Sequence, residues 1–139
     1  MSRFIGRENL RKRLVPLEGS AGRTAYGDGI VQKYSHDGAQ LLLQIGTRGI
    51  CDNPPANTCG NSGGNPLANQ SQTLLNQPAD VWVDPNPDPV TGQRGSIYIA
   101  DGYGNHRVAV FNASGTFVRQ WGGVAGVVQV RPGDGRSPH

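Results

Sequence analysis

The sequence predicts an all-β fold built from short antiparallel strands, and three observations support this prediction. Runs of alternating apolar residues flank turns rich in Gly, Asn and Asp, a pattern typical of β-hairpins. The chain holds 21 Gly and 10 Pro among 139 residues and only 6% aromatic residues, which indicates a turn-rich protein with a modest core. The third observation is an internal repeat, which constrains a fold more than an isolated motif does.

The first half of the chain contains one predicted hairpin between two stretches without a regular pattern. Residues 1–27 form a basic, irregular head with no sustained periodicity. Residues 28–46 predict two strands, because apolar residues precede and follow the turn Ser35-His36-Asp37-Gly38. Residues 47–76 predict a long loop rich in Asn, Pro and Gly. A loop of this length inside a compact domain is usually functional or an insertion.

Four consecutive strands are predicted for residues 77–123. Each strand has alternating apolar positions, and turn-forming residues separate it from the next. Four short strands in about 45 residues match the size of one β-propeller blade. The predicted strands cover residues 79–84, 96–101, 106–111 and 117–121.

The hairpin at residues 28–46 repeats the last two strands of that blade. Two unrelated hairpins would also share Gly-containing turns, but the common order of aromatic residue, turn Gly, apolar run and closing Gly favours a true repeat. Residues 28–46 are therefore interpreted as the end of one blade and residues 77–123 as a complete second blade. The fold prediction is about one and a half four-stranded blades. The equivalent pairs are Val31 and Val108, Tyr34 and Phe111, Gly38 and Gly115, Leu41 and Phe117, Gln44 and Gln120, Ile45 and Trp121, and Gly46 and Gly122.

The two ends of the chain match no blade. The tail, residues 124–139, is irregular and rich in Gly and Pro, with residues 124–130 compatible with one strand. We interpret both ends as non-propeller sequence, of the kind that a truncated or frame-shifted reading of a longer gene produces.

Charge and hydropathy argue against nucleic-acid and membrane partners. Residues 1–23 hold six Arg or Lys and two Glu, whereas residues 24–123 hold five Arg or Lys and seven Asp. The strand-forming part therefore has no basic, aromatic-interleaved face for nucleic acid. No apolar run approaches the length of a membrane span. The head lacks a signal-peptide core, so the chain as written predicts a cytoplasmic protein; a truncated N-terminus would be compatible with a periplasmic or secreted one.

Cys51 and Cys59 are the two cysteines, and both lie in the long loop. A small loop disulfide fits an oxidising compartment, and two free thiols fit a reducing one equally well. Seven intervening residues and no nearby His argue against a zinc site.

Residues 77–123 resemble the NHL-repeat family of β-propellers. The resemblance rests on the segments Gln77–Asp84, Ile97–Asp101, Asn105–Val108 and Phe117–Gly122. It extends back through the long loop, so that it covers about residues 28–123 and implies a partial NHL-type propeller.

Within that family, Asp101-Gly102-Tyr103-Gly104-Asn105-His106-Arg107 looks most like a motif of the peptidyl-α-hydroxyglycine α-amidating lyases. The resemblance implies a catalytic role for Tyr103, in removing a proton from the hemiaminal hydroxyl. It also implies a zinc ion held by three His, each in a Pro-His dipeptide on other blades. The only Pro-His dipeptide here is at the last two residues, and Gly104 replaces the family's Cys. The sequence therefore predicts no cofactor in this chain and leaves its activity as an enzyme undecided.

The remaining motif residues favour a structural role and a binding function. Asp101, Asn105 and Arg107 are predicted to hold the turn through hydrogen bonds and an ion pair. No metal site is predicted, because the three His show no ligand spacing. The predicted function is a binding scaffold whose loops contact a protein, peptide or glycan. The alternative is part of a zinc-dependent peptidyl-α-hydroxyglycine (peptidylamidoglycolate) lyase.

Overall fold

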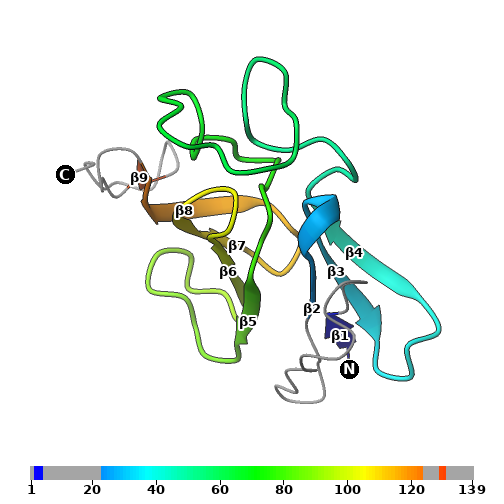
Figure 1. The fold of residues 1–139 in the computed structure, drawn as a ribbon. Helices are drawn as coiled ribbons and strands as arrows, with labels where there is room; N and C mark the ends of the chain where they lie inside the picture. Colours follow the sequence, from blue (N-terminus) through cyan, green and yellow to red (C-terminus); the bar gives the residue numbers. More distant parts are fainter. Residues whose placement is uncertain (1, 5–22, 124–128, 131–139) are drawn as a thin grey trace.

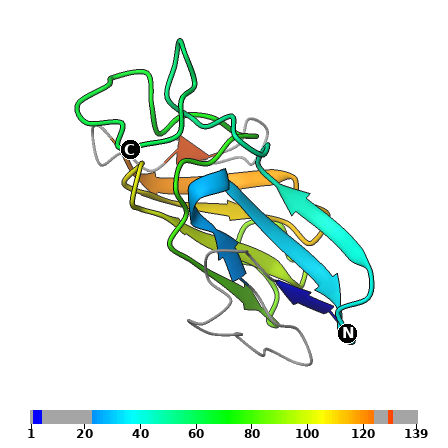
Figure 2. The ribbon, with the colours of Figure 1, turned by 45° about the vertical axis from the view of Figure 1, so that its right-hand side comes forward.

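The computed structural model describes residues 2–4, 23–123 and 129–130, which form two antiparallel β-sheets (Figures 1 and 2). The described residues contain no α-helix, only the short 3-10 helix η2 (Tyr26–Asp28). The all-β prediction is confirmed, and the two sheets have the form of partial propeller blades that do not close into a ring. The strands are β1 (Ser2–Phe4), β2 (Arg23–Ala25), β3 (Ile30–Ser35), β4 (Leu41–Ile45), β5 (Asp80–Asp84), β6 (Ser96–Asp101), β7 (Arg107–Phe111), β8 (Phe117–Gly122) and β9 (Gln129–Val130).

The first sheet is organised around β3. Strand β4 pairs with one edge of β3 as the sequence predicts. Strands β1 and β2 pair with different halves of β3, so they lie end to end along its other edge. Both strands fall in the head that was expected to be irregular. A three-residue strand is too short to show a period, and here the open edge of β3 supplies its hydrogen-bonding partner.

The second sheet follows chain order from β5 to β9, with each strand paired to the next. The limits of β5 to β8 agree with the predicted strands to within one residue. Strand β9 pairs with Arg119 and Gln120 of β8 and lies within residues 124–130, the part of the tail that the sequence left compatible with one strand. Residues 77–123 therefore provide four of the five strands of this sheet.

The internal repeat is visible in the backbone. The β3–β4 ladder shifts register between Lys33 and Tyr34, and the β7–β8 ladder shifts at the equivalent step, between Val110 and Phe111. The closing glycines match as well, because Gly46 has φ 91° and Gly122 has φ 89°. A Cβ at Gly46 would collide with the backbone where β3 begins, and a Cβ at Gly122 would collide with the backbone where β7 begins. Glycine is therefore required at both positions. The two hairpins therefore share a bulge and a strand ending, not only a sequence pattern.

The hydrophobic core lies between the two sheets. Ile97 and Ile99 of β6 and Ala109 and Phe111 of β7 are fully buried, as expected for alternate positions of one sheet face. The Phe111 ring meets that of Phe117 edge to face, with ring centroids 5.7 Å apart. The other buried members of this core are Val31, Ile45, Leu75 and Val81.

The opposite face of the second sheet carries aromatic rings and an ion pair. Trp82 is 43% exposed and Trp121 is 38% exposed. Tyr98 lies between them, with its ring centroid 5.3 Å from Trp82 and 6.1 Å from Trp121. Arg119 donates to both carboxylate oxygens of Asp88, at 2.8 and 2.9 Å, and to the Tyr98 hydroxyl at 2.8 Å.

The Asp88 ion pair predicts a pH-dependent contribution to stability. Burial alone would raise the pKa of Asp88, but hydrogen bonds from Ser96, the Val90 N–H and Arg119 outweigh it and lower the pKa below 3.8. A carboxyl whose pKa is lower in the folded state stabilises the fold above its unfolded pKa, and this contribution is lost as the pH falls through the folded pKa. Asp88→Asn is therefore expected to cost more stability at pH 7 than at about pH 3. Urea unfolding of both proteins at each pH measures this, and an equal cost at both would contradict it.

Candidate functional site

The tip of the β6–β7 hairpin holds Tyr103 at the surface. The Tyr103 side chain is 52% exposed. Its backbone N–H donates to the carbonyl of Gln77 at 3.2 Å. The N–H groups of Gly104 and Asn105 both donate to the carbonyl of Asn76, at 3.1 and 3.2 Å. Three backbone hydrogen bonds thus attach the tip to the corner where the long loop ends.

Gly104 allows the long loop to approach the tip closely. A Cβ at this position would overlap the side-chain amide of Asn76, which is fully buried. The Gly104 carbonyl accepts from both the backbone N–H and the hydroxyl of Ser62, each at 2.8 Å. The tip is therefore packed against two separate parts of the loop, and only glycine fits between them.

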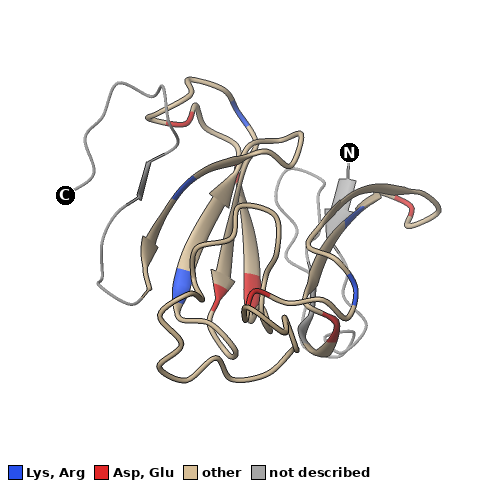
Figure 3. Ribbon diagram, turned by 90° about the horizontal axis from the view of Figure 1, so that it is seen from above, with Lys and Arg blue, Asp and Glu red and all other residues tan. Residues whose placement is uncertain are grey.

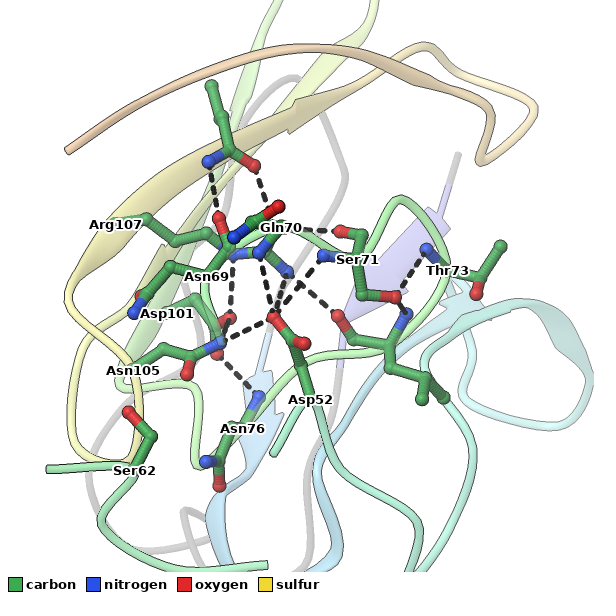
Figure 4. A network of polar contacts seen from close by, with 12 residues as sticks. Asp52, Ser62, Asn69, Gln70, Ser71, Thr73, Asn76, Asp101, Asn105 and Arg107 are labelled. Atoms are coloured by element: carbon green, nitrogen blue, oxygen red, sulfur yellow. Dashed lines mark hydrogen bonds and ion pairs between the residues drawn. The ribbon is translucent and has the colours of Figure 1, made fainter. Parts of the chain in front are cut away.

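Arg107 at the start of β7 is the centre of a buried polar network (Figure 4). Its side chain has no exposed surface. The guanidinium donates to Asp101 at 3.0 Å and to the Gln120 side chain at 2.8 Å. It also donates to the carbonyls of Ser71 at 2.7 Å and Leu74 at 2.8 Å. Because its donors reach two strands and the loop, Arg107 ties the loop to the sheet.

Asp101, the last residue of β6, completes the base of the tip. Its carboxylate accepts from the backbone N–H of Asn76 at 2.8 Å and from the Asn105 amide at 3.0 Å, besides Arg107. Burial raises the pKa of the Asp101 carboxyl, and the positive charge of Arg107 opposes this effect. The sequence prediction grouped Asp101, Asn105 and Arg107, and the structure brings all three together beneath the tip.

Asp52 joins this network from the long loop and was not identified from the sequence. One of its carboxylate oxygens accepts from the Asn105 amide at 3.1 Å and lies 3.8 Å from the Arg107 guanidinium. The same oxygen accepts from the backbone N–H groups of Gln70 and Ser71 at 3.2 and 3.3 Å. An Asp in a polar loop has no sequence signal that distinguishes a buried position from a solvated one. Its role was therefore missed.

Asn69, Asn76 and Gln120 were missed for the same reason. Asn69 accepts from the His106 backbone N–H at 2.8 Å through its side chain, and from Gln120 at 2.6 Å through its carbonyl. Asn76 exchanges two hydrogen bonds with the backbone of Gly60, at 3.1 and 2.7 Å. These side chains fasten a loop that has no regular secondary structure of its own. Buried backbone groups need such partners when no strand supplies them.

Cys51 and Cys59 form a disulfide within the loop, with Cα atoms 4.9 Å apart. The pair closes the segment beside Asp52, and Gly29 packs directly against the Cys51 sulfur. The sequence left a disulfide and free thiols equally open. The bonded state places both sulfurs beside the first sheet and leaves neither as a metal-binding thiolate.

The described residues do not fit a zinc site. No cluster of three or more His, Cys, Asp or Glu among them is arranged to hold a metal ion. His36 lies in the exposed β3–β4 turn and His106 lies at the exposed hairpin tip, and no other His is described. Zinc ligation by three His therefore has no counterpart in the part of the chain that the structure describes.

Charged residues of the described part are spread along both sheets and their loops (Figure 3). Opposite charges meet where β6 ends and β7 begins, at Asp101 and Arg107. No helix in the described part of the chain is long and apolar enough to span a membrane.

The four-stranded antiparallel unit and its β6–β7 hairpin are typical of a propeller repeat. Comparison with protein families shows which repeat it resembles. Residues 90–111 match the NHL repeat, over a segment that includes β6, the tip and β7. The resemblance to NHL-repeat propellers that the sequence predicted is confirmed.

The chain is also similar to peptidylglycine α-amidating monooxygenases. Form B from Xenopus laevis is 43% identical over 63 residues, which is 45% of this chain and 6% of the frog protein. The Rattus norvegicus enzyme is 40% identical over 63 residues, with the same coverage. The matched part thus spans only 6% of the length of these relatives. The predicted resemblance to amidating enzymes is confirmed at this partial level.

Proposed function

We propose that residues 28–123 act as a binding scaffold and that the hairpin tip carrying Tyr103 contacts a peptide ligand. The observation that carries this proposal is an exposed aromatic side chain on a tip fixed by buried hydrogen bonds. Such a ring loses little conformational freedom on binding, because its backbone is already ordered. Aromatic residues held in this way contribute a large share of binding energy in many interfaces.

The long loop extends this surface beside the tip. Leu67 is 56% exposed, and its neighbour Ala68 is buried next to Asn69, which bonds to the tip. The loop end of the molecule thus presents an apolar side chain and a tyrosine on a rigid base. An extended peptide suits a surface that offers apolar contact together with a phenolic hydroxyl.

A peptide is favoured over a protein or glycan ligand by the relatives. Their names specify peptidylglycine as the substrate of those enzymes. We therefore propose a peptide whose carboxyl end is glycine or α-hydroxyglycine. The disulfide further favours an oxidising location, either periplasmic or extracellular.

A second candidate function is part of a peptidyl-α-hydroxyglycine lyase, and the exposure of the Tyr103 phenol favours it. In that reaction a base takes the proton of the α-hydroxyl group. The hydroxyl oxygen then forms the C=O of glyoxylate as the C–N bond breaks, and the amide nitrogen takes up a proton to leave the peptide amide. In this candidate Tyr103 is the group that accepts the proton, and a phenol needs neighbouring positive charge to work as a base near neutral pH. Because the described residues fit no zinc site, this candidate requires further residues outside them.

One experiment separates the two candidates. The whole chain is mixed with a fluorescent peptide ending in α-hydroxyglycine, and both binding anisotropy and glyoxylate release are measured. A scaffold binds the peptide without release, and Tyr103→Ala is expected to weaken binding about tenfold or more. Tyr103→Phe keeps the ring and is expected to retain most of that binding.

A lyase would instead release glyoxylate, and Tyr103→Phe would lower the rate about 100-fold or more. The matched control is Trp82→Ala, which removes another exposed aromatic ring. Trp82 lies on β5, on the face of the second sheet that points away from the core, and is not part of the hairpin tip. It is expected to leave peptide binding unchanged. If the wild-type chain neither binds the peptide nor releases glyoxylate, both candidates are wrong.

A further inference from the structure

The way the first sheet packs on the second indicates what could pack on the remaining face of each sheet. Val31, Leu43 and Ile45 of the first sheet face the second sheet and join its core. The repeat places Val108, Arg119 and Trp121 at the equivalent positions of the second sheet. In the second sheet these residues point away from the first sheet. The second sheet therefore presents outward the same face that the first sheet uses for packing.

That outward face has the composition of a protein interface. Trp82 and Trp121 are both more than a third exposed, and Tyr98 bridges them. The Arg119 guanidinium lies 5.6 Å from the Tyr98 ring centroid, and Asp88 balances its charge. Trp, Tyr and Arg are enriched in protein interfaces, where rings provide contact area and fixed polar groups provide orientation.

The outward face of the first sheet is equivalent, by the repeat, to the face of the second sheet that receives the first sheet in the core. Ala109, Phe111 and Phe117 of the second sheet receive the first sheet in the core. Their repeat equivalents are Gln32, Tyr34 and Leu41.

Strand alternation and pairing place these three residues, with Gln44 beside them, on the face of the first sheet away from the core, where Gln32 is itself buried and Tyr34 is half-buried. The Tyr34 hydroxyl donates to Gln32 at 3.3 Å, Gln32 donates to Gln44 at 2.9 Å, and Leu41 is 50% exposed. Both halves of a second sheet-on-sheet contact are therefore present on one chain, but on opposite sides.

We propose that a second copy of this chain stacks the outward face of its first sheet, defined by Gln32, Tyr34, Leu41 and Gln44, on the outward face of the second sheet, defined by Trp82, Tyr98, Val108, Arg119 and Trp121. The contact is heterologous, because each copy uses two different surfaces. Such a contact continues from copy to copy and produces a closed ring or an open array, not a simple dimer. This proposal is independent of the proposed peptide binding at the loop end.

Sedimentation velocity of the whole chain at increasing concentration tests the proposal. The wild-type chain is expected to form species larger than a dimer. Trp121→Lys and Leu41→Lys place a charge on opposite faces, and each is expected to weaken self-association about tenfold or more. Leu67→Lys, which changes an exposed leucine in the long loop, is the matched control and is expected to assemble as the wild type does.

A mixture of the two face variants gives the decisive result. Trp121→Lys keeps an intact first-sheet face and Leu41→Lys keeps an intact second-sheet face, so the mixture is expected to form a one-to-one pair that grows no further. A symmetric dimer that Leu41→Lys leaves intact would overturn the proposal, and so would a wild-type chain that stays monomeric at every concentration. Circular dichroism checks that each variant is folded, with Trp82→Lys replacing Trp121→Lys if the latter is not.

Discussion

Arg107→Leu is expected to lower the free energy of unfolding by about 3–5 kcal/mol, because it leaves a buried carboxylate without its cation. Asp101 is fully buried and Asp52 is nearly so, and Arg107 is the cation that both approach. The substitution also removes the donors to two loop carbonyls, so the long loop loses its attachment to β7. Urea unfolding monitored by tryptophan fluorescence measures the loss.

Two further variants test the cause of this effect. Arg48→Leu removes the ion pair between Arg48 and Asp28, in which the arginine side chain is 45% exposed. It is expected to lower the free energy of unfolding by less than about 1 kcal/mol. Arg107→Lys keeps the charge but cannot reproduce the planar set of donors, so an intermediate loss is expected. If Arg107→Leu proved no more costly than Arg48→Leu, the buried network would not stabilise the fold.

Phe111→Ala is expected to destabilise the protein by about 3–5 kcal/mol through a cavity between the two sheets. Phe111 is fully buried and is the largest of the fully buried side chains of the described residues, and its ring packs edge to face on Phe117. The surrounding residues come from both sheets, so the cavity cannot close by the movement of one strand alone.

The control for this change is Leu42→Ala, at a residue of β4 that is 50% exposed. It is expected to alter the free energy of unfolding by no more than about 0.5 kcal/mol. Thermal unfolding by circular dichroism compares the two variants. Equal midpoints for Phe111→Ala and the wild type would show that the two sheets do not share one core.

Strands β3 to β8 were predictable because their signals are local. Alternation of apolar residues reports which face of a strand is buried, and turn-forming residues mark where it ends. Gly46 and Gly122 were matched by sequence order alone, and both adopt the same left-handed conformation at the end of a strand. The short strands β1 and β2 were not predicted, since pairing with an existing edge creates them. Strand β9 lies within residues 124–130, which the sequence left compatible with one strand.

The candidate site was predictable only in part. Asp101, Asn105 and Arg107 are close in the chain, so the sequence grouped them, and hydrogen bonds join Asp101 to the other two. Their partner Asp52 is 53 residues from Asn105, and no spacing connects them. A carboxylate in a polar loop is expected to be solvated unless the path of the loop is known.

The sequence by itself determined strands β3 to β8, their turns and the repeat, because each depends on residues within one hairpin or on neighbouring strands. The tertiary structure alone decided that the long loop folds over the β6–β7 tip, that Asp52 and Asn76 become buried there, and that Tyr103 stays exposed above them. These outcomes depend on contacts between residues far apart in the chain, and a polar side chain carries no local mark of which distant partner will bury it.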